Sequence, residues 1–215
     1  MRKYLSLLVI ATISILLAVS GCKKENNDDS TNTGFTDTFD RAAMLTNIGA
    51  HVIIPTYAEM ESTAASLDSA LGLFCTAPNE SNLITAQAAW FEAIKAAKRV
   101  ESTKVGYIAD GHLYSLIHRW PVNTSFIEGF INGTDTINAE YVSNKGATAR
   151  GLAAIEYMLF PAKDSNNGLL LTKYTSENNA ARRCAYLKGL GTVQHTNSLK
   201  ILNAWLPQQQ NYLGT

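Results

Sequence analysis

A single carboxylate interrupts an otherwise apolar segment of this chain, and its chemistry is the first question that the sequence raises. The segment is GLAAIEYMLF, residues 151–160, and its residue types favour a helix. On a helix, side chains three and four positions apart are neighbours. Around Glu156 those positions hold Leu152, Ala153, Leu159 and Phe160. None of them can pair with a charge, so the carboxylate must be neutralised, paired elsewhere or bound to a metal.

Two of these outcomes have candidate partners in the sequence. An ion pair would tie the Glu156 helix to a neighbour, and the candidate cations are Arg119, Arg150 and Arg182. A metal or substrate site would need help from distant segments, and the candidates are His51, Glu59 and His112. No H-E-x-x-H zinc motif is present, and His112 and His118 lie about 240° apart around a helix. Both outcomes therefore stay open.

Nucleophilic chemistry finds little support in the residue pattern. The sequence has no G-x-S-x-G elbow and no phosphate-cradling glycine loop. Cys75 has no histidine or basic neighbour, whereas Cys184 follows Arg182 and Arg183, whose charges would lower its pKa. An exported location permits a disulfide between the two cysteines. We predict two free thiols, with Cys75 the more buried because two large apolar residues precede it.

The N-terminal residues have the pattern of a targeting segment. Arg2 and Lys3 precede an apolar run, residues 5–19, which is too short and wrongly flanked for a stable membrane-spanning helix. The run ends in VSGC, and small residues before a cysteine resemble the bacterial lipobox, in which the cysteine is lipidated. We predict a signal peptide over residues 1–21 and an outer-membrane lipoprotein of the bacterial envelope, anchored through Cys22 and facing the periplasm or the surface. The alternative is a plain secretory leader.

The residues after the predicted signal peptide differ in composition and are expected to form a tether followed by one domain. Residues 22–37 are mostly polar and predict a disordered tether, and residues 38–215 suit a single domain. Removing two of the 18 basic residues with the leader leaves 16 against 18 acidic residues, a net charge of −2. With no basic patch and no interleaved aromatic residues, the chain is not expected to bind nucleic acid.

Apolar residues recur at helical spacing along most of the domain. One stripe consists of Met60, Ala64, Leu67, Leu71 and Phe74. The next consists of Leu83, Ala86, Trp90, Ile94, Ala97 and Val100. The short loop between them indicates an antiparallel pair of helices. Together with the shorter stripes that follow, the pattern predicts an all-α fold, an up-down bundle of about four to six helices.

Four residues add local expectations. Pro55 lies within the first long stripe and should kink its helix. Gly189 and Gly191 lie within the last predicted helix and should weaken it. His195 follows them and is expected to be solvated.

The segment around Glu156 resembles the signature helix of the imelysin family. The matching residues are KGATARGLAAIEYMLF, 145–160. Four more segments agree in the same order along the chain. They are 45–57 with its proline and tyrosine, 86–94 centred on Trp90, 119–123 with the sequence RWPVN, and 182–187. The resemblance runs from about residue 38 to about residue 206.

The resemblance implies a fold and two classes of function. Members of the family resemble two packed four-helix bundles with a site in the groove between them. They include metal-dependent peptidases and iron-regulated or iron-uptake proteins of the envelope. The family signature is G-x-H-x-x-E, whose histidine and glutamate share one helical face and can hold one metal. Gly151 and Glu156 match it, but Ala153 stands at the histidine position, which argues against peptidase activity.

The chain also stops at Thr215, where the second bundle of the family would begin. We therefore expect only the first half of the family fold, as a truncated product, a bundle that folds alone, or one that pairs with another protein or a second copy of itself. The sequence predicts a lipid-anchored, imelysin-like envelope protein that binds iron or another divalent metal through Glu156, with no catalytic residue. The alternatives are an imelysin-type metallopeptidase and a structural surface module with Glu156 in an ion pair.

Overall fold

The computed structural model describes residues 38–206. The predicted signal peptide, the lipidation site Cys22 and the tether lie outside the described residues. The chain divides at Asp40, where the helical unit begins. Within the described range, none of the helices combines the length and the apolar character that a membrane crossing requires.

The unit consists of helices joined by turns, and residues 38–206 contain no strand. The long helices are α3 (Ile54–Thr76), α4 (Glu80–Arg99) and α10 (Ala180–Asn203). The short helices are α2 (Arg41–Ile48), α5 (Tyr107–Asp110), α6 (Thr124–Asn132), α7 (Ala139–Ser143), α8 (Leu152–Leu159) and α9 (Asn167–Thr175). Short π or 3-10 turns are η1 (Gly49–Ile53), η2 (Val100–Thr103), η3 (Leu113–Leu116) and η4 (Ala147–Ala149). The predicted all-α class is confirmed.

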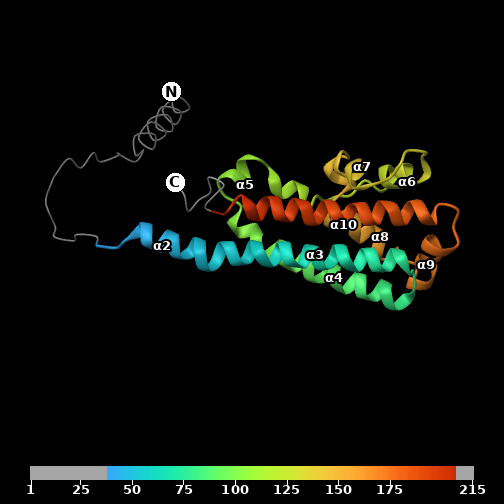
Figure 1. Cartoon of the computed structure of the whole chain (residues 1–215), viewed down its shortest axis with the longest axis horizontal. Coiled ribbons are helices and arrows are strands. Elements are labelled where there is room, and N and C mark those ends of the chain that lie inside the picture. Colours follow the sequence, from blue (N-terminus) through green and yellow to red (C-terminus); the bar gives the residue numbers. More distant parts are fainter. Residues whose placement is uncertain (1–37, 207–215) are drawn as a thin grey trace, which may run out of the picture. The chain divides into compact units, whose positions relative to one another are not determined.

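The three long helices form the frame of the unit. Figure 1 shows α3 and α10 running side by side, with α4 on the other flank of α3. The predicted stripe on α3 is buried from Met60 to Phe74 and faces these two helices. On α4, four of the six buried residues are alanines, which let the neighbouring helices approach closely. Each fully buried large apolar side chain in this frame stabilises it by roughly 1.5–3 kcal/mol.

The short helices cover the rest of the frame. α6 and α7 pack on α10, whereas α8 and α9 contact both α4 and α10 (Figure 1). Four helices begin at an asparagine whose side chain accepts a hydrogen bond from the amide three residues on. These asparagines are Asn79, Asn123, Asn138 and Asn166. Because such a cap satisfies a backbone donor that has no helical partner, it fixes where each helix starts.

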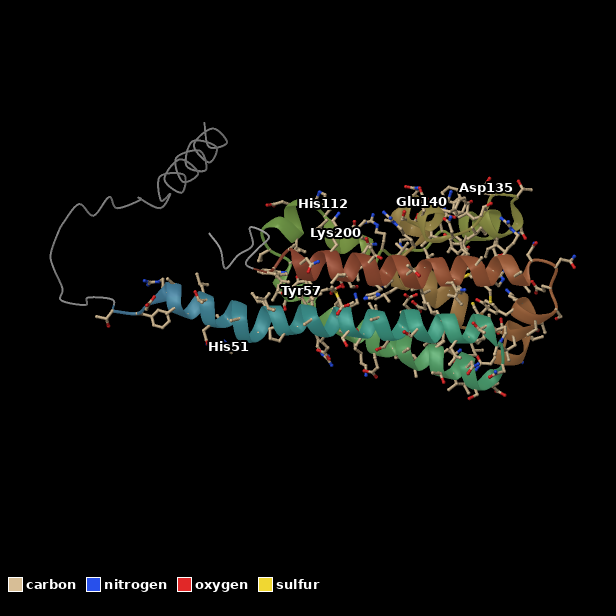
Figure 2. All side chains as sticks on the ribbon, viewed as in Figure 1. His51, Tyr57, His112, Asp135, Glu140 and Lys200 are labelled. Carbon is tan, nitrogen blue, oxygen red and sulfur yellow. The ribbon has the colours of Figure 1, made fainter. Side chains whose placement is uncertain are left out.

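Pro55, which was predicted to kink its helix, lies where a π turn passes into α3. The π turn η1 comes directly before α3, and Pro55 lies in the first turn of α3. That position needs no backbone donor, so the proline is tolerated. Upstream, α2 has no buried residue, and it extends beyond the bundle as Figure 1 shows. His51, labelled in Figure 2, lies in η1 directly after α2 and is exposed.

Gly189 and Gly191 do not interrupt α10, which is continuous through both. A Cβ atom at Gly189 would lie 2.7 Å from Cγ2 of Val142, and one at Gly191 would lie 2.7 Å from Oδ1 of Asp68. The two glycines therefore allow α7 and α3 to pack closely against α10. The helix is continuous because close packing against α7 and α3 compensates for the low helix propensity of glycine, so whether the two glycines weaken it stays a prediction.

Candidate functional site

The helix that carries Glu156 begins at a glycine that the backbone requires. Gly151 has a φ of +79°, a conformation that residues with a side chain rarely adopt. A Cβ atom there would lie 2.7 Å from the carbonyl oxygen of Ile117. That oxygen accepts a hydrogen bond of 2.9 Å from the amide of Leu152. Gly151 thus lets α8 start in contact with the segment that precedes Trp120 and Pro121, two residues joined by a cis peptide bond.

Three side chains from neighbouring helices hold α8 by its carbonyl oxygens. The indole Nε1 of Trp90 donates to the carbonyl of Leu152 at 2.8 Å. Gln87 donates to the carbonyl of Leu159 at 2.8 Å, and the hydroxyl of Tyr174 donates to that of Met158 at 2.6 Å. Met158 and Leu159 lie in the last turn of α8, where carbonyls lack a helical partner, so the bonds from Tyr174 and Gln87 satisfy acceptors that would otherwise be unpaired. They also fix the direction in which Glu156 projects.

Glu156 lines a cavity of about 320 Å³ beside α8. Most of the cavity wall is apolar, and its large side chains are Trp120, Val122, Tyr157, Phe160 and Leu170. Its charged side chains are Glu156, Lys173 and Arg183. Ala153 lines the same cavity, which confirms that positions 153 and 156 share one face of the helix. An apolar pocket with a few converging polar groups is the usual form of a small-molecule site.

Glu156 itself has no hydrogen bond or ion pair with any described residue. Its side chain is half-buried, and burial raises its pKa above the usual value. The three predicted partners do not reach it. Arg150 donates to the carbonyl of Ser143, Arg182 donates to backbone carbonyls of α6 and the turn after it, and Arg119 is exposed. The carboxylate is therefore free to meet a ligand.

A second carboxylate nearby is fully paired. Glu128 accepts hydrogen bonds from Arg183 at 2.7 and 3.0 Å and from the hydroxyl of Tyr157 at 2.8 Å. Arg183 is almost completely buried, with an exposed fraction of 6%. Burial acts to raise the pKa of Glu128, but the hydrogen bonds from Arg183 and Tyr157 and the charge of Arg183 outweigh it, so the pKa is lowered.

The other candidate ligands do not approach the cavity. His51 and His112 are exposed, and Glu59 pairs with Arg99. None of the three lines the cavity of Glu156. His195 was expected to be solvated, but it is half-buried and its Nε2 lies 2.8 Å from Glu61 on α3. The close packing of α10 on α3 explains the difference.

The residues around Glu156 do not fit a resident metal ion. No group of three or more histidine, cysteine, aspartate or glutamate side chains gathers anywhere in residues 38–206. The other charged groups of the cavity, Lys173 and Arg183, would repel a bare cation. A structural or catalytic zinc site needs at least three protein ligands. That Glu156 is a metal ligand therefore remains a prediction.

The sequence reasoning missed Arg183 and Lys173, although a signal for Arg183 was present. It precedes Tyr186 by three residues and Leu187 by four, so helical spacing places it on the buried face of α10. The cysteines also differ from expectation. Cys184 is buried whereas Cys75 is only partly so, because Cys184 faces the core from α10.

Both the sequence and the fold are similar to those of known proteins. The sequence model of the imelysin family matches residues 53–214. No protein of curated function matches the sequence. Among solved structures, the chain is similar to one described as an iron-regulated protein A precursor from Parabacteroides distasonis, with 19% identity and a TM-score of 0.66. The similarity covers 80% of this chain and 48% of that one, so this chain spans about half the length of that relative.

Proposed function

Because the chain belongs to the imelysin family, we propose that it is an iron-associated binding protein of the cell envelope and not a peptidase. The cavity beside α8 carries this proposal, since Glu156 lines it without a partner and Ala153 stands next to it in the wall. A metallopeptidase holds its metal with three protein ligands and keeps an open position for water. The described residues around this cavity offer one such ligand.

Iron would enter this cavity as cargo, carried by an anionic organic chelator. Glu156 would offer one carboxylate to the iron, as carboxylates do in di-iron proteins. Lys173 would bind a carboxylate of the chelator. The aromatic side chains of Trp120 and Phe160 would contact its carbon skeleton. The relative described as iron-regulated supports iron as the metal.

Equilibrium dialysis tests this proposal directly. The protein would be dialysed against ferric citrate, citrate alone, ferrous ions and zinc ions. We expect ferric citrate to be retained best, and Glu156→Gln to reduce its retention by about tenfold, the value of one charge-assisted contact. Glu59→Gln is the matched control, because Glu59 is exposed and remote from the cavity lining. Equal retention by Glu156→Gln, or none by the parent, would contradict the proposal.

A peptidase assay distinguishes the alternative function, that of a metallopeptidase, from the binding role. Positions 153 and 156 share a cavity wall, so Ala153→His would restore the pair of residues in the family signature. We expect the parent to cleave no peptide in the presence of zinc. Cleavage by the parent that is lost in Glu156→Gln would establish a peptidase and overturn the binding role.

We also propose that Cys22 is lipidated and anchors the protein in the outer membrane. The proposal rests on the small residues before Cys22 and the polar segment after it. Cells that carry Cys22→Ala would be washed without detergent, and the protein should then leave the membrane fraction. Continued association of Cys22→Ala with the membrane would contradict lipid anchoring.

A further inference from the structure

The two cysteines of the described unit face each other across the packed helices α3 and α10. Cys75 lies in the last turns of α3, and Cys184 lies in the second turn of α10. The thiol of Cys75 donates to the carbonyl oxygen of Cys184 at 3.5 Å, and the thiol of Cys184 donates to that of Cys75 at 3.7 Å. Two cysteines 109 positions apart in sequence therefore meet, each thiol in contact with the backbone of the other residue.

The surroundings of the pair favour sulfur chemistry over metal binding. No third histidine, cysteine, aspartate or glutamate completes a metal-binding group with them in the described residues. Cys75 is partly exposed, so a small reagent can reach the pair, and Cys184 is 8% exposed. The cation that influences both thiols is Lys188, one turn further along α10. Two adjacent thiols without a metal partner are the reduced form of a disulfide.

We propose that Cys75 and Cys184 form a reversible disulfide that links the end of α3 to the start of α10. The bond needs the two sulfur atoms to approach to about 2.05 Å. Both residues lie in helices that already pack along their length, and the reciprocal contacts between each thiol and the other residue's carbonyl keep the two side chains close. Cys184 directly follows Arg183, so the bond would also tie the cavity's buried cation to α3.

Thiol–disulfide exchange with oxidised glutathione would form this bond. Hydrogen bonding from Cys75 and the charge of Lys188 lower the pKa of Cys184, whereas the pKa of Cys75 is raised. One thiolate of the pair would attack oxidised glutathione at the edge that the partly exposed Cys75 leaves open, and would release one glutathione thiolate to leave a mixed disulfide. The other thiol would then lose its proton to solvent and attack the protein sulfur of the mixed disulfide, releasing the second glutathione. Two protein thiols are oxidised, and one glutathione disulfide is reduced to two thiols.

Mass spectrometry of the full chain tests the proposal. Cys22→Ala serves as the background, because Cys75 and Cys184 are then the two remaining cysteines. The folded protein would be incubated with oxidised glutathione, unfolded, alkylated with iodoacetamide and digested. We expect a linked pair of peptides containing Cys75 and Cys184, and the loss of two hydrogen atoms from the intact chain. Alkylation of both thiols, glutathione adducts alone, or a bond between two chains would overturn the proposal.

A thermal melt measures what the bond does. The oxidised protein should have a Tm higher than the dithiothreitol-reduced protein by at least about 5 °C, because the bond closes a long loop in the unfolded chain. Cys75→Ser in the same background is the control, and its Tm should be the same with and without oxidised glutathione. Equal Tm values for the oxidised and reduced parent would show that the bond does not constrain the fold.

Discussion

Arg183 pairs with Glu128 and also lines the cavity that Glu156 lines, but only one of these two glutamates has a hydrogen-bonding partner. Glu128 accepts three hydrogen bonds, two from Arg183 and one from Tyr157. Glu156 lines the cavity that Arg183 also lines, yet it has no partner among the described residues. The cation is therefore committed to structure through Glu128. The unpaired carboxylate of Glu156 is therefore the group available to a ligand, whereas Glu128 and Arg183 are occupied by each other.

Substitution of Arg183 should change the free energy of unfolding more than any other substitution considered for these two glutamates. Arg183→Met leaves the partly buried carboxylate of Glu128 without its cation. Breaking a fully buried pair destabilises a protein by about 3–5 kcal/mol, and because Glu128 is partly solvated we expect a loss of up to about 3 kcal/mol. Urea unfolding measured by circular dichroism would give the difference. Lys95→Met is the matched control, because Lys95 pairs with Glu92 on the exposed face of α4 and should cost less than about 1 kcal/mol. Similar losses in the two variants would remove the distinction between Glu128 and Glu156.

The glycine that starts α8 should give the next largest effect. Gly151→Ala places a Cβ atom against the carbonyl oxygen of Ile117 in a conformation that alanine rarely adopts. We expect a destabilisation of about 1–3 kcal/mol, together with weaker ligand binding at Glu156. Gly129→Ala is the control, because Gly129 lies in α6 with open space around it and should gain up to about 1 kcal/mol. A neutral Gly151→Ala would show that α8 does not depend on this turn.

The two carboxylates should respond to pH in opposite directions. The pKa of Glu128 is lowered, so its contribution is present above the pKa of the unfolded chain and is lost as pH falls through the folded value. The pKa of Glu156 is raised, so its contribution is present at low pH and is lost as pH rises through the folded value. Unfolding free energies of the parent, Glu128→Gln and Glu156→Gln between about pH 3 and pH 7 would measure both. Curves of the same sign would contradict the assignment.

Substitution of Glu156 should have the smallest effect on stability. Glu156→Gln removes a charge that no described residue compensates, so the free energy of unfolding at neutral pH should stay within about 0.5 kcal/mol of the parent or rise slightly. The same variant is expected to lose ligand binding, which makes it the opposite of Arg183→Met. A loss above about 2 kcal/mol in urea unfolding would mean that Glu156 has a structural partner.

Much of the fold could be predicted from the sequence because it depends on local spacing. The stripe on α3 is buried from Met60 to Phe74 as its helical periodicity indicated, and the stripe on α4 is buried from Leu83 to Ala97 except for Ile94, which is partly buried. The shared face of Ala153 and Glu156 follows from the same geometry, and both line the cavity. The family resemblance, now supported by a match over residues 53–214, came from ordered motifs that need no tertiary information.

The partners of charged side chains could not be predicted, because they depend on how the helices pack. Arg182 was a predicted partner of Glu156, but it donates to backbone carbonyls, and its neighbour Arg183 pairs with Glu128. The sequence of α10 does not reveal which other helices pack against each of its side chains. Gly189 shows the same limit, because only the position of Val142 explains why a glycine is needed there.

The positions of the three tryptophans have an optical consequence. Trp90 and Trp205 are buried, with exposed fractions of 6% and 3%, whereas Trp120 is 64% exposed and lines the cavity. Buried indoles emit at shorter wavelengths than solvated ones, so the long-wavelength part of the fluorescence spectrum comes from Trp120. Acrylamide should quench that component first, and a molecule that fills the cavity should shield it. The protein thus contains its own fluorescent reporter of occupancy, which Trp120→Phe would silence.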